Sequence, residues 1–337
     1  MSEMRWSMIH ERWALIAPDR RTRPGAHRHA PATPRSPDPN CPFCPGNEEK
    51  TPPQTDILPG AANDPAGWRA RAVPNKYPAV GGPAPNPRSH GPFPFRTGAG
   101  RHEVIVDSPV HLQGLADLPD EHTGEILVFL QRRVREFYRN DSIRAITVFK
   151  NHGAAAGASL PHSHIQVVGL PEVPSSVAKA RETAARFRQK EGRALLAHFI
   201  ETERKEKARI IEEGGEVIVL CPFASRFPYE TLISPWPVEE SFCESPRESL
   251  RAVGGALART LRRIKTLLAD PPLNVAFHLE VRPGDADSPP ACAWYVEVLP
   301  RLAVLAGLEA GFGLHINATS PEDAAAELRG AGAEFAG

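Results

Sequence analysis

Apolar residues recur along the chain at the two spacings that distinguish strands from helices. Over the first half they predict a strand, a helix and two further strands, at residues 102–111, 118–140, 146–150 and 162–170. The helical segment carries its apolar residues on one face, at Leu127, Leu130, Val134 and Phe137. Asp120 precedes that face and is placed to cap the N-terminus of the helix.

The same order of elements returns in the second half. Two strands flank an aromatic and proline-rich bend over 217–237, a helix follows Ser245, and two more strands are predicted at 274–284 and 293–301. Ser245, Pro246 and Glu248 have the pattern of a capping box with proline at the first helical position. We therefore expect an α+β fold with two copies of one antiparallel-sheet unit and flanking helices. The predicted divisions are residues 1–172, a helical connection over 173–218, and residues 219–337.

The amino-acid composition favours a small ligand over a nucleic acid or a membrane as the partner of this protein. Proline contributes 36 of 337 residues, about twice its usual ~5% share, and is concentrated at 26–40 and 81–95, which we expect to be loops. Lys plus Arg and Asp plus Glu both number 40, so no charge surplus favours a nucleic acid or an anionic membrane. The N-terminus lacks the apolar stretch of a signal peptide, and the most apolar later segment, 302–314, is short. These features predict a cytoplasmic protein that binds a small ligand.

One close pair of cysteines, Cys41 and Cys44, stands apart from three scattered ones that we expect to be buried small residues. In a cytosolic chain, this two-residue spacing favours one metal ion over a disulfide framework. Zn²⁺ takes four ligands in a structural site, so histidines must complete it, and we favour His111 and His162. Other histidines compete on sequence grounds, namely His10, His27, His29, His90 and His102. His102 and His152 are equally suited to surface or hydrogen-bonding positions.

The run His162-Ser163-His164-Ile165-Gln166 lies in a predicted strand, where residues two apart share a face. Two imidazoles and an amide on a half-buried face need a ligand, a metal or hydrogen-bonding loops as partners. Just before this run, the loop Asn151–Ser159 has almost no side-chain bulk, so an anion can approach its backbone N–H groups. The combination predicts a phosphate-binding site, with histidines bonded only to neighbouring loops as the plain alternative.

Three motifs together resemble the galactose-1-phosphate uridylyltransferases, a branch of the histidine-triad superfamily. They are CPFCPGNE at 41–48, SPVH at 108–111 and NHGAAAGASLPHSHIQ at 151–166, and the resemblance runs in order over nearly the whole chain. It implies two histidine-triad-like halves, with the catalytic site and the zinc in the N-terminal half, and a homodimer whose sites lie near the subunit interface. It further implies that Cys41, Cys44, His111 and His162 bind Zn²⁺, that His164 is the nucleophile, and that Gln166 holds the phosphoryl oxygens.

Nucleotide-binding residues follow from the same resemblance. Arg20 and Arg23 match a phosphate-contacting segment near the N-terminus, although a solvated basic loop is the alternative. Asn75 resembles a nucleotide-contacting asparagine, and the loop around the phosphates is matched by Asn151, Gly157 and Ser159.

Three departures from the uridylyltransferase pattern bear on the substrate. Ser163 stands where those enzymes usually have proline, which is similar to the plant-type ADP-glucose phosphorylases of the same superfamily. Lys76 stands where an aspartate usually follows the asparagine. In the C-terminal half, Tyr295 and Glu297 replace a histidine pair, so a second metal site is expected to be incomplete.

The leading functional hypothesis is transfer of UMP from UDP-glucose to galactose 1-phosphate through a nucleotidyl-His164 intermediate. The close rival is ADP-glucose phosphorylase, which transfers AMP to phosphate, and a third is a dinucleoside-polyphosphate phosphorylase. A zinc-stabilised nucleotide sensor without turnover is the non-enzyme alternative. Expected partners are nucleotide sugars and sugar phosphates or phosphate, with neither a nucleic acid nor a membrane.

Overall fold

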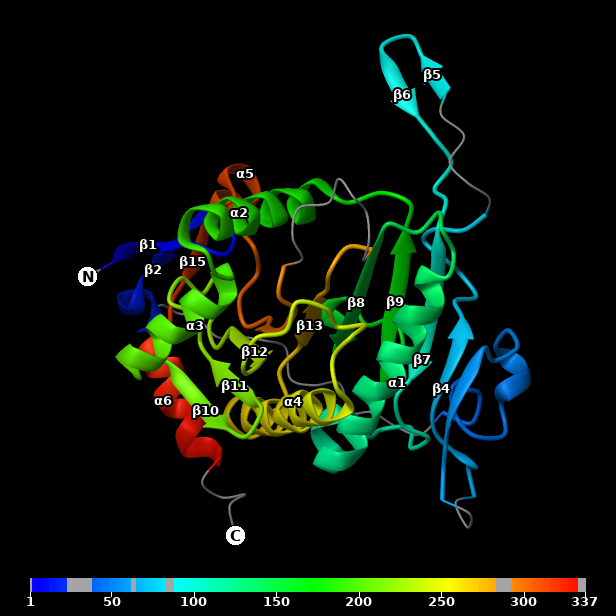
Figure 1. Ribbon diagram of the computed structural model, residues 1–337. Helices are drawn as coiled ribbons and strands as arrows, with labels where there is room; N and C mark the ends of the chain where they lie inside the picture. The colour runs from blue at the N-terminus through cyan, green and yellow to red at the C-terminus, as the bar shows by residue number, and fades with distance from the viewer. Residues whose placement is uncertain (1, 23–37, 62–64, 83–87, 283–291, 333–337) are drawn as a thin grey trace.

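The computed structural model describes residues 2–22, 38–61, 65–82, 88–282 and 292–332. Its centre is a ten-stranded sheet in which every neighbouring pair is antiparallel (Figure 1). In spatial order the strands are β10 (Ile210–Gly214), β11 (Val217–Leu220), β12 (Thr231–Pro235), β14 (Tyr295–Pro300), β13 (Leu273–His278), β8 (Ala145–His152), β9 (His164–Leu170), β7 (Arg101–Val106), β4 (Trp68–Pro74) and β3 (Asp56–Pro59).

The order of strands repeats about the β8–β13 junction. Reading outward, β8, β9, β7, β4 and β3 on one side correspond to β13, β14, β12, β11 and β10 on the other. Each set has one long helix between its third and fourth strands in chain order, α1 (Asp120–Tyr138) or α4 (Arg247–Leu268). The expected α+β fold with a repeated succession of elements is therefore confirmed. The limits at 172 and 218 stay a prediction, and β10 lies within 173–218.

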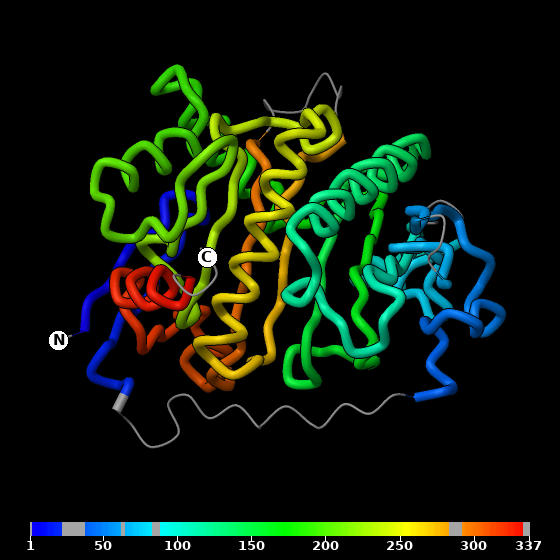
Figure 2. Tube along the Cα trace, turned by 90° about the horizontal axis from the view of Figure 1, so that it is seen from below, coloured from blue at the N-terminus to red at the C-terminus, as the bar shows by residue number. Residues whose placement is uncertain are grey.

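Helices α1 and α4 lie side by side across one face of the sheet (Figure 2). The predicted apolar faces of both helices are buried against alternate residues of the central strands, such as Ile165 and Val296. The helices approach closely because glycines meet at their contact: a Cβ on Gly254 would lie 2.6 Å from the Cα of Gly124. This packing leaves the other face of the sheet free to carry polar side chains.

The two predicted helix caps are wrong. Helix α1 begins at Asp120 itself, and that carboxylate forms ion pairs with Arg259 and Arg262 of α4. Helix α4 begins at Arg247, and the Ser245 hydroxyl donates to the carbonyl of Ser241, 2.8 Å away. Asp120 therefore pairs with residues distant in sequence, and Ser245 bonds to the turn that precedes it. Neither side chain caps the helix for which its local pattern predicts a cap.

The expected helical connection is broken in two. Helix α2 (Ser175–Glu191) ends at Gly192, whose φ of +71° is left-handed, and α3 (Leu195–Glu206) follows. The N-terminal strands β1 (Glu3–Ser7) and β2 (Arg12–Ile16) pair with each other, and β2 pairs in parallel with β15 (His315–Asn317). This small sheet lies with α5 (Gly307–Phe312) and α6 (Pro321–Gly332) at the β10–β12 end of the large sheet, whereas residues 38–61 lie at the β3–β4 end (Figure 2).

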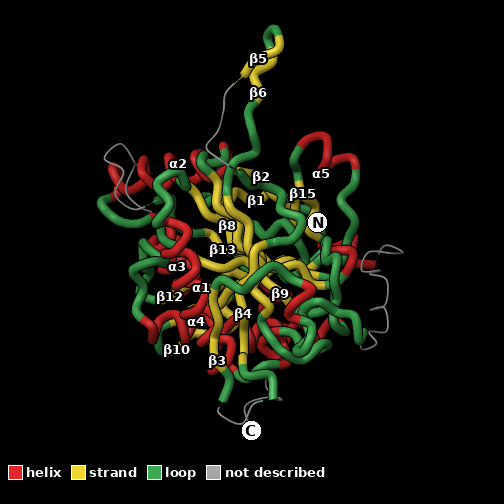
Figure 3. Tube along the Cα trace, turned by 90° about the vertical axis from the view of Figure 1, so that its right-hand side faces the viewer, coloured by secondary structure: helices red, strands yellow, loops and turns green. Residues whose placement is uncertain are grey.

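The prediction of a loop over 81–95 is wrong for its second part, because β5 (Arg88–His90) and β6 (Phe93–Phe95) pair there as a hairpin that projects from the body of the protein (Figures 1 and 3). Phe93 is 69% exposed and Phe95 52% exposed. None of the helices in the described part of the chain combines the length and the apolar character that crossing a bilayer requires.

Candidate active site and metal centre

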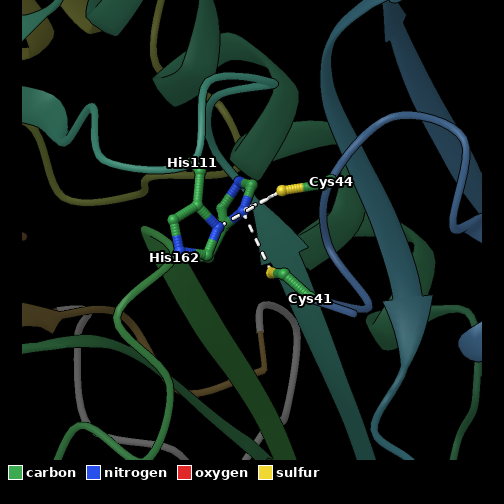
Figure 4. Close-up of side chains that lie close together, drawn as sticks. All are labelled: Cys41, Cys44, His111 and His162. Carbon is green, nitrogen blue, oxygen red and sulfur yellow. Dashed lines mark hydrogen bonds between the residues drawn. The ribbon is translucent and has the colours of Figure 1, made fainter. Parts of the chain in front are cut away.

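Four side chains predicted to bind metal converge on one point, Cys41, Cys44, His111 and His162 (Figure 4). One ligand atom of each lies within 4.8 Å of the others. The Nδ1 of His162 is 3.4 Å from the sulfur of Cys41 and 3.6 Å from that of Cys44, and the Nδ1 of His111 is 3.2 Å from the Cys44 sulfur. We call these four side chains the metal cluster.

The three sulfur–nitrogen separations of 3.4, 3.2 and 3.6 Å are those expected around a tetrahedral ion. With metal–sulfur bonds of ~2.3 Å and metal–nitrogen bonds of ~2.0–2.1 Å, neighbouring ligand atoms are about 3.5 Å apart. The other ring nitrogen of His162, Nε2, donates to the carbonyl of Ser108 at 2.8 Å, which leaves Nδ1 unprotonated and aimed at the two sulfurs. Burial lowers the pKa of His162 to about 4, so the ring is a neutral ligand at neutral pH.

Local hydrogen bonds shape the turn that carries the two cysteines. The side-chain amide of Asn47 donates to the carbonyls of Pro39 and Cys41, both at 2.9 Å. From strand β4, the buried guanidinium of Arg71 donates to the carbonyl of Pro42 at 2.8 Å. Both thiols are therefore held toward the histidines by the backbone of their own turn.

His164 is the first residue of β9, and His162 lies in the bend before it, not in the strand as predicted. Both rings nevertheless lie on one side, each in edge contact with Phe43. Ile165 belongs to the core under the helices, so His164 and Gln166 face the opposite side of the sheet. We call this side, which carries Val104, His164 and Gln166, the site face.

The ring of His164 has a defined tautomer. Its Nδ1 lies 2.8 Å from the carbonyl of His162, and a carbonyl can only accept, so Nδ1 carries the proton. Nε2 therefore keeps its lone pair. Burial lowers the pKa of His164 below its ordinary value, and the ring is neutral at neutral pH. A neutral imidazole with an unprotonated Nε2 can attack an electrophile.

Beneath this turn, on the side of the helices, Lys150 is buried at 3% exposure. Its ammonium donates to Asp107 Oδ2 at 2.8 Å, to Ser163 Oγ at 2.6 Å and to the carbonyl of His164 at 3.2 Å. Asp107 is fully buried. Ser163, which departs from the proline of the uridylyltransferase pattern, thus supplies an acceptor that proline lacks.

Gln166 and Asn75 approach each other through His102, which neither motif included. The Oε1 of Gln166 lies 3.0 Å from the Nε2 of His102, and the Nδ2 of Asn75 lies 3.1 Å from the same nitrogen. Asn75 follows β4, and its backbone N–H donates to the carbonyl of His102 at 2.9 Å. The structure therefore brings these two predicted site residues together from different strands.

The loop Asn151–Ser159 is fixed by the C-terminal half. The side chain of Asn274, on β13, donates to Asn151 Oδ1 at 2.8 Å and to the carbonyl of Ala156 at 2.9 Å. The Asn151 amide in turn donates to the carbonyl of Gly157, whose φ of +88° requires glycine. Gly157 and Ser159 are exposed, so the loop is open to a ligand.

Arg20 is not brought to His164 within one chain. It is exposed in the turn Pro18–Thr22 after β2, and the neighbouring Arg21 pairs with Glu327 of α6 at 2.8 Å. Helix α6 packs on β10, and five strands separate β10 from β9, which carries His164. Arg23, the other predicted phosphate-contacting arginine, lies outside the described residues.

In the C-terminal half, Glu297 of β14, one of the two residues that replace the expected histidine pair, lies in an ionic network. Glu297 accepts from Arg226 at 2.9 Å and lies 2.8 Å from His278 Nε2 and 3.2 Å from His10 Nε2. Burial opposes the charge, but Arg226 and His278 hold the pKa of Glu297 well below its ordinary value. Within the described ranges, the metal cluster is the one group of three or more Cys, His, Asp or Glu side chains arranged to hold a metal.

Sequence reasoning missed Lys150, Asp107 and Asn274, and it left His102 undecided. Asp107 and Lys150 each lie within a segment predicted to be a strand, where two buried charges of opposite sign are a signal of pairing. For Asn274 the sequence contains no comparable signal, because its partners belong to a loop more than 100 residues away.

A family model described as "Galactose-1-phosphate uridyl transferase, N-terminal domain" matches residues 1–174, and one for a domain of unknown function matches residues 103–330. An ADP-glucose phosphorylase of Arabidopsis thaliana is 32% identical over 336 residues, covering 97% of this chain and 92% of that protein. A galactose-1-phosphate uridylyltransferase of Thermotoga maritima is 24% identical over 337 residues, covering 98% of both.

The fold agrees with these similarities. The crystal structure of an Arabidopsis thaliana ADP-glucose phosphorylase with bound ADP-glucose superimposes with a TM-score of 0.81, at 30% identity, and 98% of each chain is covered. The matched family model and the relative of more than 30% identity each span at least half of the chain. The chain belongs to the galactose-1-phosphate uridylyltransferase family of nucleotidyltransferases.

Proposed function

We propose that this protein transfers a nucleotidyl group by way of a covalent bond to His164. The observation that carries the proposal is the tautomer of His164: its Nδ1 proton is held by the His162 carbonyl, which leaves Nε2 unprotonated, and the residue lies on the same face of β9 as Gln166. No separate base is needed, because the neutral ring already has the lone pair that attacks.

In the first step, His164 Nε2 attacks the phosphorus that bears the nucleoside. An N–P bond forms, the P–O bond to the sugar phosphate breaks, and the electron pair leaves with that phosphate oxygen. Because the second pKa of a phosphate monoester is ~6, the leaving group departs without a general acid. Gln166 and the backbone N–H groups of the loop Asn151–Ser159 then serve to hold the phosphoryl oxygens, while Asn75 contacts the nucleoside.

In the second step, an oxygen of the acceptor phosphate attacks the same phosphorus. The N–P bond breaks, and its electron pair returns to Nε2, which restores the starting enzyme. With phosphate as acceptor and ADP-glucose as donor, the products are ADP and glucose 1-phosphate.

We favour ADP-glucose and phosphate over UDP-glucose and galactose 1-phosphate as the substrates. The support is the higher identity of the ADP-glucose phosphorylase, 32% against 24% for the Thermotoga uridylyltransferase over similar lengths. The second support is Ser163, which stands in place of the usual proline as in the plant-type ADP-glucose phosphorylases. Its hydroxyl accepts a hydrogen bond from buried Lys150. Uridylyl transfer remains the second candidate, favoured by the family model that matches residues 1–174.

The metal proposed for the metal cluster is Zn²⁺, since two thiols and two imidazoles are a usual donor set for tetrahedral structural zinc. When bound, zinc would fix the Cys41–Cys44 turn to the bend that contains His162. That bend is continuous with His164, so the metal cluster holds the nucleophile in place without taking part in bond making.

We also propose a homodimer. The turn that contains Arg20 is tied to α6 beside β10, and five strands lie between β10 and β9, which carries His164, so we infer that Arg20 serves the site of a partner subunit. Exposed apolar side chains on the segment around α5 offer a surface for association; they are Val304, Leu305 and Phe312, exposed by 90%, 51% and 85%.

The decisive experiment incubates the protein separately with ADP-glucose and UDP-glucose and weighs the intact chain. We expect an AMP adduct that is absent from His164→Ala and is discharged by phosphate. His90→Ala, which alters an exposed histidine of the projecting hairpin, is the matched control and should label like the parent. An adduct on His164→Ala equal to that on the parent would contradict the proposal, and an adduct without any acceptor-dependent discharge would favour the sensor.

A further inference from the structure

His102 uses both of its ring nitrogens inside the protein. It is 8% exposed, and it lies on β7 diagonally opposite Gln166, because Val104 faces Gln166 and His102 faces Val168 in the β7–β9 register. Its Nδ1 is 3.1 Å from the backbone nitrogen of Ala79, and its Nε2 is 3.0 Å from Gln166 Oε1.

The backbone contact decides where the His102 proton resides. The N–H of Ala79 can only donate and cannot be rotated, so Nδ1 must be its acceptor. In the neutral ring the proton is then on Nε2, which donates to Gln166 Oε1. Burial lowers the pKa of His102, in keeping with a neutral ring, since a second proton at Nδ1 would meet the Ala79 N–H.

Asn75 does not reverse this assignment. Its Nδ2 lies 3.1 Å from His102 Nε2, but its Oδ1 already accepts from the backbone N–H of Tyr77 at 2.8 Å. Turning the ring proton to Nδ1 in order to accept from Asn75 would set two donors together at Ala79. With its proton on Nε2 the ring cannot accept from Asn75, so the 3.1 Å approach of Asn75 Nδ2 is a contact between two donors and not a hydrogen bond. The backbone N–H of Ala79 is the fixed donor of the two, and it therefore decides the tautomer.

The proton on His102 Nε2 fixes the direction of the Gln166 amide. A terminal amide has two orientations of similar intrinsic energy, which differ by exchange of oxygen and nitrogen. With its oxygen held by His102, Gln166 must present its NH₂ group away from His102. An NH₂ group attracts an anionic phosphoryl oxygen, whereas the amide oxygen would repel it.

We propose that His102 is a positioning residue for nucleotidyl transfer: it orients the Gln166 amide with NH₂ toward the phosphoryl group and ties this orientation to the Asn75–Ala79 turn. This inference rests on the proposed function of His164 and Gln166. It assigns to His102 no contact with the substrate.

Two substitutions of His102 each keep one of its two hydrogen bonds and remove the other. In His102→Gln, the side-chain NH₂ reaches the place of Nε2 and keeps the donor to Gln166. In His102→Asn, the shorter side chain reaches only the place of Nδ1 and keeps the acceptor for Ala79. We expect the rate of adduct formation in a single turnover to fall about 10- to 100-fold in His102→Asn, as for other residues that orient a reacting group, and His102→Gln to keep most of the parent rate.

Metal content and thermal midpoints of both variants establish that each is folded. If the Gln and Asn variants slow equally, His102 serves packing alone and the proposal is wrong. Nitrogen-15 NMR of the full-length parent supplies a readout independent of turnover: we expect the Nε2-protonated neutral tautomer at His102. An Nδ1-protonated or doubly protonated ring would overturn the orientation argument. If neither nucleotide sugar labels the parent, the proposed function fails, and the NMR result still decides whether His102 directs the amide.

Discussion

The substitution Lys150→Met tests the buried support of the His162–His164 turn. Methionine retains much of the length and apolar character of the lysine stem but removes the ammonium. Three hydrogen bonds are lost, to Asp107, Ser163 and the carbonyl of His164. Asp107 Oδ1 is buried and has no hydrogen-bond partner among the described residues, so the carboxylate would keep no side-chain partner for its charge.

The magnitude follows from that unpaired charge. Removing one partner of a buried ion pair costs about 3–5 kcal/mol, because the desolvated charge left behind is uncompensated. With a urea dependence of about 3 kcal/mol per molar, a loss of ~4 kcal/mol lowers the unfolding midpoint by roughly 1.3 M. Ser163→Ala removes a single acceptor from the ammonium and should cost less, about 1.5–3 kcal/mol.

The double variant Lys150→Met with Asp107→Leu provides the control. Replacing a whole buried pair with apolar groups of similar size is often close to neutral, so the double variant should be more stable than Lys150→Met alone. Urea unfolding followed by fluorescence measures the parent, Lys150→Met, Asp107→Leu, the double variant and Ser163→Ala. If the double variant loses as much as the two single losses added together, the pair is not coupled and the reasoning fails.

Three other predictions concern metal, packing and association. Mass spectrometry of the native chain should find about one zinc ion per chain. We expect this zinc to be lost in Cys41→Ser and retained in the control Cys292→Ser. Equal zinc content in the two variants would show that the metal cluster does not bind the metal. Gly254→Ala should lower the free energy of unfolding by about 1–3 kcal/mol, because its Cβ would lie 2.6 Å from a Cα of α1. Gly330 is exposed in α6 and a Cβ there would have no atom within 4 Å, so Gly330→Ala should raise the free energy of unfolding by about 0.5–1 kcal/mol. Calorimetry that ranks the two variants the other way would refute the close contact between α1 and α4. Phe312→Glu should shift the protein from dimer toward monomer, as measured by light scattering. If the mass of the particle is unchanged, the surface around α5 does not form the dimer interface.

Local pattern was sufficient for the two long helices, the central strands and the chemistry of the site. Helices α1 and α4 form where apolar residues recur at helical spacing, and the central strands form at short runs rich in Val, Ile and Leu that the fold buries. The spacing of Cys41 and Cys44 indicated a metal, and the alternation of His164, Ile165 and Gln166 put the predicted nucleophile and its amide on one face.

Local pattern failed where a distant residue competed for a side chain. Asp120 has the composition of a helix cap, but two arginines of α4 lie against it and form ion pairs with it instead. His162 was assigned to a strand, but the Ser108 carbonyl and the cysteines hold it in the bend before β9. A periodicity describes the face of an element and contains no information about what will be packed against that face.

The α+β class, the repeated succession of elements, and the residue types suited to binding metal and attacking phosphorus could all be predicted from the amino-acid sequence. Which nitrogen of each histidine carries a proton could not, because that depends on carbonyl and N–H groups from other segments of the folded chain. The same is true of the pairing of Lys150 beneath the nucleophile and of the contact by which Asn274 fixes the phosphate loop from the other half of the chain. Hydrogen bonds are directional and short-ranged, so their partners are defined only once strands far apart in sequence lie side by side.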